Sequence, residues 1–188
     1  SFRIDSSAAL EDLDATPLPG AVLDIASAGR HLVTAVQDGL LLHSLDGDGR
    51  LLQLSAQPGT TAQALIAHPG EQWIYALSAG GLLERWLIDR VAGRLSGPVV
   101  TRIGSDATEV TIDPSGRVAL VLEPLTALLA VFTIESDSGM LRPWTQVTLP
   151  GRPAGMAVDA ARGQVAIAFP DRREVVVYGI TANQPRIE

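Results

Sequence analysis

The chain has 188 residues, 46% of them apolar, and a formal net charge of −7. The absence of cysteine excludes disulfides and thiolate metal sites, and the acidic balance argues against binding to the phosphate backbone of nucleic acids. No apolar run reaches the roughly 18 residues of a membrane span, and no charged-then-apolar export signal stands at Ser1. We therefore expect a soluble protein that binds no nucleic acid, in a compartment, cytoplasmic or periplasmic, that composition leaves open. All fourteen basic residues are arginine, which is a bacterial-type composition.

A motif the length of a propeller blade recurs along the chain. It contains a short apolar strand, a His-Pro-Gly or Asp-Pro-Ser-Gly turn, a second apolar strand, a loop, a strand with an aromatic residue, and Gly-x-Leu. The register is fixed by the residues that end the third strands: Phe2, His43, Trp86, Phe132 and Tyr178. Their separations of 41, 43, 46 and 46 residues are typical of four-stranded blades. The sequence therefore predicts an all-β propeller, or a propeller segment, of four-stranded antiparallel blades.

The first elements of the chain lie in the middle of a repeat. Residues 2–10 match residues 132–141, and residues 18–20 match residues 149–151. Residues 1–20 are therefore interpreted as a half blade that supplies a third and a fourth strand. The repeats that follow span residues 21–60, 61–106, 107–152 and 153–188. We interpret the whole chain as a single propeller segment of about four and a half blades.

Each complete repeat opens with two short apolar strands bounded by turn residues. First strands are expected at residues 22–26, 64–67, 110–113 and 155–159, and second strands at residues 31–36, 73–77, 118–122 and 165–169. Ala26, Ala67 and Ala157 in the first strands suit positions crowded around a central axis. The third strands, at residues 128–134 and 174–180 for example, are richer in β-branched and aromatic residues, as expected where sheets splay apart.

Aromatic side chains are expected to fill the cores between blades: Trp73, Trp86, Phe132, Trp144 and Tyr178. The alternative is a pair of helices over residues 82–88 and 119–129, which have high helix propensity. Pro124 would break the second helix, and twelve prolines and eighteen glycines interrupt the chain too often for helices of ordinary length. The all-β interpretation is therefore favoured.

Two segments of the repeat resemble a known family. They are His68-Pro69-Gly70-Glu71-Gln72-Trp73-Ile74-Tyr75 and residues 132–143, which run from Phe-Thr-Ile-Glu through Gly-Met-Leu. This pattern is similar to the repeat of seven-bladed lactonase-type propellers, a group that includes the propeller 6-phosphogluconolactonases and muconate-lactonizing relatives. The resemblance covers residues 2 to about 180. It implies a propeller fold and, as one functional interpretation, hydrolysis of a sugar lactone.

A lactone hydrolase needs a group that polarises the ester carbonyl and a carboxylate or histidine that activates water. Such groups are expected where the loops between second and third strands, and between fourth and first strands, gather around the axis. Glu123 and Arg172 are the catalytic candidates on these loops, and the binding candidates are Asp106, Arg152, Asp171 and Arg173. In the lactonase-like pattern the second strand often closes with Asn-Glu, and Glu123 fits that Glu, although Leu122 precedes it. Adjacent arginines such as Arg172 and Arg173 could hold a carboxylate or a phosphate group.

Other polar residues are better explained as structural. His68, Asp113 and Asp159 precede turns, where their side chains are expected to accept backbone hydrogen bonds. Residues 46–49, Asp-Gly-Asp-Gly, form a tight hairpin turn and lack the further ligands of a calcium loop. No metal site and no cofactor is expected.

Four and a half blades leave sheet faces and edges uncovered at both ends of the stack. We therefore expect the chain to be a segment of a larger propeller, to form an oligomer with a second copy, or to be completed by another protein chain. The function expected first is a binding or scaffold module that mediates protein–protein or ligand interactions within a larger assembly or a larger propeller. The alternative, implied by the family resemblance, is a sugar-lactone hydrolase, so enzymatic activity stays an open question with the non-enzymatic role favoured.

Overall fold

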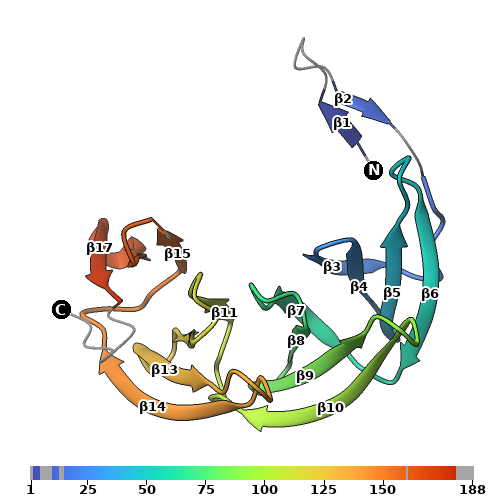
Figure 1. Ribbon diagram of the computed structural model, residues 1–188. Coiled ribbons are helices and arrows are strands. Elements are labelled where there is room, and N and C mark those ends of the chain that lie inside the picture. Colours follow the sequence, from blue (N-terminus) through green and yellow to red (C-terminus); the bar gives the residue numbers. More distant parts are fainter. Residues whose placement is uncertain (1, 5–9, 13–14, 160, 181–188) are drawn as a thin grey trace.

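The computed structural model describes residues 2–4, 10–12, 15–159 and 161–180. Within these ranges the regular structure is almost entirely β-strand, in three four-stranded sheets, one three-stranded sheet and one two-stranded pair. Figure 1 shows the four larger sheets side by side along an open arc. The predicted all-β propeller architecture is confirmed, and the described residues contain no α-helix.

Each larger sheet is one blade, in which antiparallel strands pair in chain order. The first blade contains β3 (Val22–Ala28), β4 (His31–Val36), β5 (Gly39–Leu45) and β6 (Leu51–Pro58). The second contains β7 (Ala62–Ala67), β8 (Trp73–Ser78), β9 (Leu82–Asp89) and β10 (Arg94–Arg102). The third contains β11 (Glu109–Ile112), β12 (Val118–Glu123), β13 (Leu128–Ile134) and β14 (Leu141–Thr148). The fourth contains β15 (Gly155–Asp159), β16 (Gln164–Phe169) and β17 (Glu174–Gly179), with a 3-10 turn, η1 (Pro170–Arg172), before β17. The separate pair is β1 (Phe2–Ile4) and β2 (Leu10–Asp12).

The first strand of each blade lies on the concave side of the arc, and the fourth strands β6, β10 and β14 lie on the convex side (Figure 1). The inner strands touch their neighbours in succession, β3 with β7, β7 with β11 and β11 with β15. Small residues in these strands, such as Ala26, Ala28 and Ala62, are buried. They allow neighbouring sheets to converge without overpacking. Of the three alanines expected at such positions, Ala26 is buried and Ala67 is half-buried, whereas Ala157 is exposed.

Adjacent blades share a hydrophobic core, and the alternation of side chains along each second strand decides which core a residue enters. In β8, Ile74 and Ala76 pack into the core with the first blade. Their neighbours Trp73, Tyr75 and Leu77 point the other way, into the core with the third blade. The second blade is therefore covered on both faces by its sequence neighbours, as in other stacked repeats.

The third blade continues this pattern. Ala119 and Val121 of β12 belong to the core shared with the second blade. Leu120 and Leu122 belong to the core shared with the fourth blade, where they meet Phe169 at the end of β16. Three successive cores therefore join the four blades into one stack.

Most of the aromatic residues predicted to fill these cores do so. Trp73, Trp86 and Phe132 are each 4–5% exposed, and Tyr178 packs against the third core. The prediction for Trp144 is wrong, because its side chain is 41% exposed. Trp144 lies on β14, an outermost strand whose residues alternate toward solvent after Leu141.

The turns between first and second strands use the predicted side-chain acceptors. Asp113 accepts hydrogen bonds from the backbone of Arg117 and Val118, at 2.9 and 2.7 Å. Asp159 accepts from the backbone of Ala161 and Arg162, at 3.0 and 3.2 Å. These contacts confirm the structural roles expected for both aspartates.

His68 stabilises its own turn and also reaches the next blade. Its Nδ1 accepts a hydrogen bond from the Gly70 N–H at 2.9 Å. Its Nε2 must then carry the ring proton, which it donates to the carbonyl oxygen of Gly116 in the third blade, also at 2.9 Å. The ring packs edge-to-face on Trp73, with centroids 5.0 Å apart. The sequence predicted the turn contact but not the link between blades.

Candidate functional site

The two ends of each blade carry different connections because the strands are antiparallel. Loops from second to third strands, and from fourth strands to the next first strand, emerge at one end, which we call the loop face. Turns from first to second and from third to fourth strands emerge at the opposite end, which we call the turn face. Five of the six candidate residues named from the sequence belong to connections at the loop face, and the sixth, Glu123, is the last residue of β12 at the same end.

A connection that we call the strap, residues 103–108, links β10 of the second blade to β11 of the third. At its start, the Ile103 N–H donates to the Gly81 carbonyl at 2.9 Å, and the Arg102 side chain donates to the Gly80 carbonyl at 3.3 Å. Gly104 has φ near 140°, and a Cβ there would lie 2.4 Å from the carboxyl carbon of Glu123. The strap backbone therefore lies directly against the Glu123 carboxyl group, an approach that only glycine permits.

Glu123 ends the second strand of the third blade and is only 5% exposed. The equivalent positions in the other blades hold Val36, Ser78 and Phe169, which are also buried. The third blade thus has a carboxylic acid at a position where the other blades have apolar or small residues. Its Oε1 atom is buried without a hydrogen-bond partner. Such an orphaned polar atom is costly and is characteristic of functional or strained positions.

Asp106, on the strap, lies beside Glu123. Its carboxylate accepts hydrogen bonds from the backbone N–H groups of Leu125 and Thr126, at 2.7 and 3.1 Å. These two donors belong to the loop that follows Glu123 and connects β12 to β13. Asp106 therefore ties the strap to that loop.

The environment moves the pKa values of the two acids in opposite directions. Burial raises the pKa of Glu123, and the neighbouring Asp106 raises it further. Partial burial also acts to raise the pKa of Asp106, but hydrogen bonds from Thr126, Leu125 and Glu123 outweigh burial and lower it. Glu123 therefore binds a proton more readily than Asp106 does. Two carboxyl groups whose pKa values are shifted in opposite directions can serve as the acid and the base of general acid–base catalysis.

The other four candidates lie on the loop face of the fourth blade. Arg172 donates to Glu174 at 2.9 Å and to the carbonyl of Pro150 at 3.4 Å, which brings it beside the loop that carries Arg152. The side chains of the remaining candidates are exposed: Arg152, Asp171 and Arg173. The structure therefore brings Asp106 to Glu123, and Arg172 to the loop of Arg152, as two separate groups in adjacent blades.

Two further carboxylates were not singled out from the sequence. Asp24 in β3 accepts a hydrogen bond from the Leu65 N–H of the next blade at 2.7 Å, and Glu109 in β11 accepts from the Met156 N–H at 3.0 Å. Burial raises the pKa of Glu109, and the bond from Met156 partly offsets this. Both brace neighbouring inner strands. The signal that could have revealed them is an acidic residue inside an otherwise apolar first strand.

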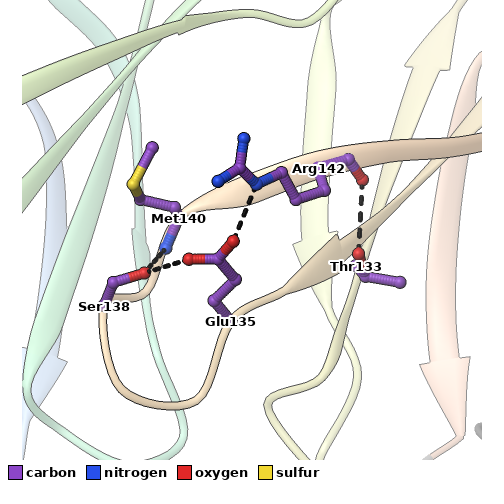
Figure 2. A network of polar contacts seen from close by, with 5 residues as sticks. All are labelled: Thr133, Glu135, Ser138, Met140 and Arg142. Atoms are coloured by element: carbon purple, nitrogen blue, oxygen red, sulfur yellow. Dashed lines mark hydrogen bonds and ion pairs between the residues drawn. The ribbon is translucent and has the colours of Figure 1, made fainter.

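One of the two segments that carry the family resemblance, residues 132–143, contains the turn between β13 and β14, which belongs to the turn face. Figure 2 shows the polar contacts of this turn. Glu135 accepts from the Ser138 hydroxyl at 2.6 Å and from Arg142 Nε at 2.7 Å, while Ser138 accepts from the Met140 N–H at 3.2 Å. The other segment, residues 68–75, contains the turn between β7 and β8, so the turns of both segments lie at the end of the blades opposite to Asp106 and Glu123.

Among the described residues, no three His, Asp or Glu side chains are grouped so as to hold a metal ion. In the same residues, no helix is long and apolar enough to cross a membrane.

No protein-family model and no curated protein matches this sequence. Solved structures match it throughout: a proposed 6-phosphogluconolactonase from Bacteroides uniformis at TM-score 0.81 and 14% identity, and a protein from Lactobacillus plantarum at 0.80 and 16%. Each match covers 100% of this chain and 62% of the other. The periplasmic gluconolactonase PpgL of Pseudomonas aeruginosa matches at TM-score 0.75 and 16% identity, over 99% of this chain and 60% of its own length.

The chain thus spans about three-fifths of the length of these structural neighbours. At such identities the likeness concerns the fold. The predicted resemblance to lactonase-type propellers is confirmed at that level, and the chain has the fold of a partial propeller of the 6-phosphogluconolactonase-like kind.

Proposed function

We propose that this chain is a propeller segment that works as a binding or scaffold module within a larger assembly or a larger propeller. The observation that supports this most directly is the outer face of the fourth blade. Val175 and Val177 on β17 are 66% and 53% exposed there. In each of the first three blades the corresponding face is covered by the next blade. Exposed apolar patches on sheets favour association.

The composition of this face favours a further propeller blade as its occupant. Ala157 and Ala166 face outward beside Val177, and together they line a shallow hollow on the sheet. Small residues of this kind allow a second sheet to approach to about 10 Å. Within the described residues, this sheet has three strands, whereas each of the other blades has four. We infer that a further blade covers this face, supplied by a larger propeller, by a second copy or by another protein chain.

The loop face is the second surface of the proposed module. The residues that we propose to contact the ligand or partner on this face are Asp106, Arg152, Asp171 and Arg173. Glu123 lies next to Asp106, and Arg172 lies next to the loop of Arg152. Arginine side chains bind carboxylate and phosphate groups through paired hydrogen bonds. The exposed arginines of the fourth blade therefore favour an anionic group on the partner.

The test of the first surface is the native mass over a range of concentrations, measured by sedimentation. The double variant Val175→Thr, Val177→Thr should weaken association at least tenfold. Val100→Thr is the matched control, because Val100 is 53% exposed but lies on β10, away from this face. A wild-type chain that stays at 19.8 kDa at every concentration would contradict closure by a second copy. Equal effects of both variants would contradict the choice of face.

Sugar-lactone hydrolysis is the second candidate function. It is supported by the Asp106–Glu123 pair, whose divided pKa values suit acid–base chemistry, and by structural neighbours named as gluconolactonases. Turnover of gluconolactone or its 6-phosphate above the spontaneous rate should then fall at least a hundredfold in Glu123→Ala. Arg172→Ala should lower the rate on the phosphorylated substrate more than on the neutral one. No turnover above background would retire this candidate.

A further inference from the structure

We propose that Asp106 and Glu123 form a proton-operated latch, which holds the strap closed over the third blade and releases it as the solution becomes more alkaline. The latch would regulate access to the loop face. It follows from the local geometry and is independent of whether that face binds a partner or a substrate.

The strap has one fixed end and one end that depends on the two acids. Its start is held to the second blade by Ile103 and Arg102, through carbonyl groups of a turn that carries no titratable side chain. Its middle is held to the third blade by Asp106, which binds the N–H groups of Leu125 and Thr126. Between these points Gly104 lies against the Glu123 carboxyl group. Glu123 therefore cannot reach water unless the strap moves.

A single proton explains how two carboxyl groups can lie together at this position. Glu123 is 5% exposed and its Oε1 has no hydrogen-bond partner, so no other group neutralises a charge there. The loop after β12, residues 124–127, contains no titratable side chain. At the two ends of the strap, Arg102 is engaged with the Gly80 carbonyl and Glu109 with the Met156 N–H. Asp106 is therefore the charged group that Glu123 faces.

A bound cation is a poorer explanation for the pair. Asp106 already directs its lone pairs at two backbone N–H donors, which leaves few oxygen positions for a metal. A third ligand is also missing, since no group of three acidic or histidine side chains occurs in the described residues. A hard divalent cation requires six or more oxygen ligands, many more than this pair offers.

Ionisation of Glu123 should open the strap because a second buried charge beside Asp106 is strongly unfavourable. The direction of the effect follows from the pKa shifts. The pKa of Glu123 is raised from 4.5, so its contribution to the closed state is complete below 4.5 and is lost as pH rises through the raised value. The pKa of Asp106 is lowered from 3.8, so its contribution is complete above 3.8 and is lost at lower pH. The strap is therefore held most firmly at pH values above 3.8 and below the raised pKa of Glu123.

The experiment is amide hydrogen exchange of the wild-type chain, read at the Leu125 and Thr126 N–H groups as a function of pH. Protection factors, which correct for intrinsic exchange, should fall about tenfold per pH unit once Glu123 ionises, because opening releases one proton. In Glu123→Gln, an amide replaces the acid and keeps a donor toward Asp106 but has no proton to lose. The protection of both amides should then be independent of pH from 5 to 8.

Glu109→Gln is the matched control. It removes another carboxyl with a raised pKa in the same blade, and it should leave the pH dependence at Leu125 and Thr126 unchanged. If Glu123→Gln does not fold, the titration of Glu123 can be followed in the wild-type chain by the NMR resonance of its carboxyl carbon. Titration of Glu123 at an ordinary pKa, or an unchanged pH dependence in Glu123→Gln, would overturn the proposal.

Discussion

Replacing His68 with alanine should destabilise the interface between the second and third blades by about 3 kcal/mol. The change removes the bond from the Gly70 N–H and the bond to the Gly116 carbonyl, each 2.9 Å long and each worth about 1 kcal/mol. It also removes the edge-to-face contact with Trp73, worth about 1 kcal/mol beyond its buried area. His68 itself is 9% exposed, so water replaces these contacts poorly.

The variant His68→Asn separates the two roles of this side chain. The third blade shows that a short acceptor suffices for the turn, because Asp113 accepts from the N–H two residues later at 3.1 Å. Asparagine should therefore keep the bond to Gly70 but cannot reach Gly116 in the next blade. We expect a loss of about 2 kcal/mol for His68→Asn, between wild type and His68→Ala.

Urea unfolding followed by tryptophan fluorescence measures both losses, since Trp73 lies against the histidine ring. Stability equal to wild type in His68→Asn would refute the link between blades. Equal losses in the two variants would refute the turn contact. A midpoint shift with an unchanged denaturant slope would show that the effect is on stability itself.

Three other changes follow from contacts between blades. Gly139→Ala should lower the free energy of unfolding by at least about 2 kcal/mol, because Gly139 has φ near 67° and a Cβ there would lie 2.6 Å from the ring of Trp73. Gly47→Ala is the control: open space surrounds Gly47, so the unfolding midpoint should change little. Tyr75→Phe should cost about 1–2 kcal/mol by removing the 2.7 Å bond from the buried phenol to the Gly139 carbonyl. Because burial raises the pKa of Tyr75, its absorbance should not show ionisation in alkali until the chain unfolds; earlier ionisation would contradict its burial. Glu109→Gln should gain in melting temperature relative to wild type as pH rises above 4.5, since the raised pKa of Glu109 makes its ionised form costly in the folded state; a constant difference would contradict this.

The sequence predicted the architecture because the repeat is expressed in features that act locally. Proline and glycine mark the turns, and short apolar runs mark the strands, so the first and second strands were found to within a few residues. Trp144 was misjudged because its position in the repeat does not reveal that β14 is the outermost strand of its sheet, with one face toward solvent. Exposure on an edge strand depends on where the strand lies in the sheet.

The candidate site could be predicted only in part. Glu123 and Asp106 were both named, but their contact depends on the strap, whose path is set by Gly104 and Gly81 in conformations that the sequence does not specify. The second role of His68 was missed for a similar reason, since Gly116 lies 48 residues further along the chain. Contacts of this kind depend on how one blade is rotated against the next, which local patterns do not encode.

Because side chains along β8 alternate between two cores, the position of a substitution decides which of the two neighbouring blades it affects. Ile74 and Tyr75 are adjacent in sequence, yet their side chains pack into different cores. Tyr75 should be coupled to Phe132, far along the chain but in the same core. A substitution at one position in β8 therefore selects which neighbour is loosened. Successive blades can thus change sequence one interface at a time while the rest of the stack keeps its packing.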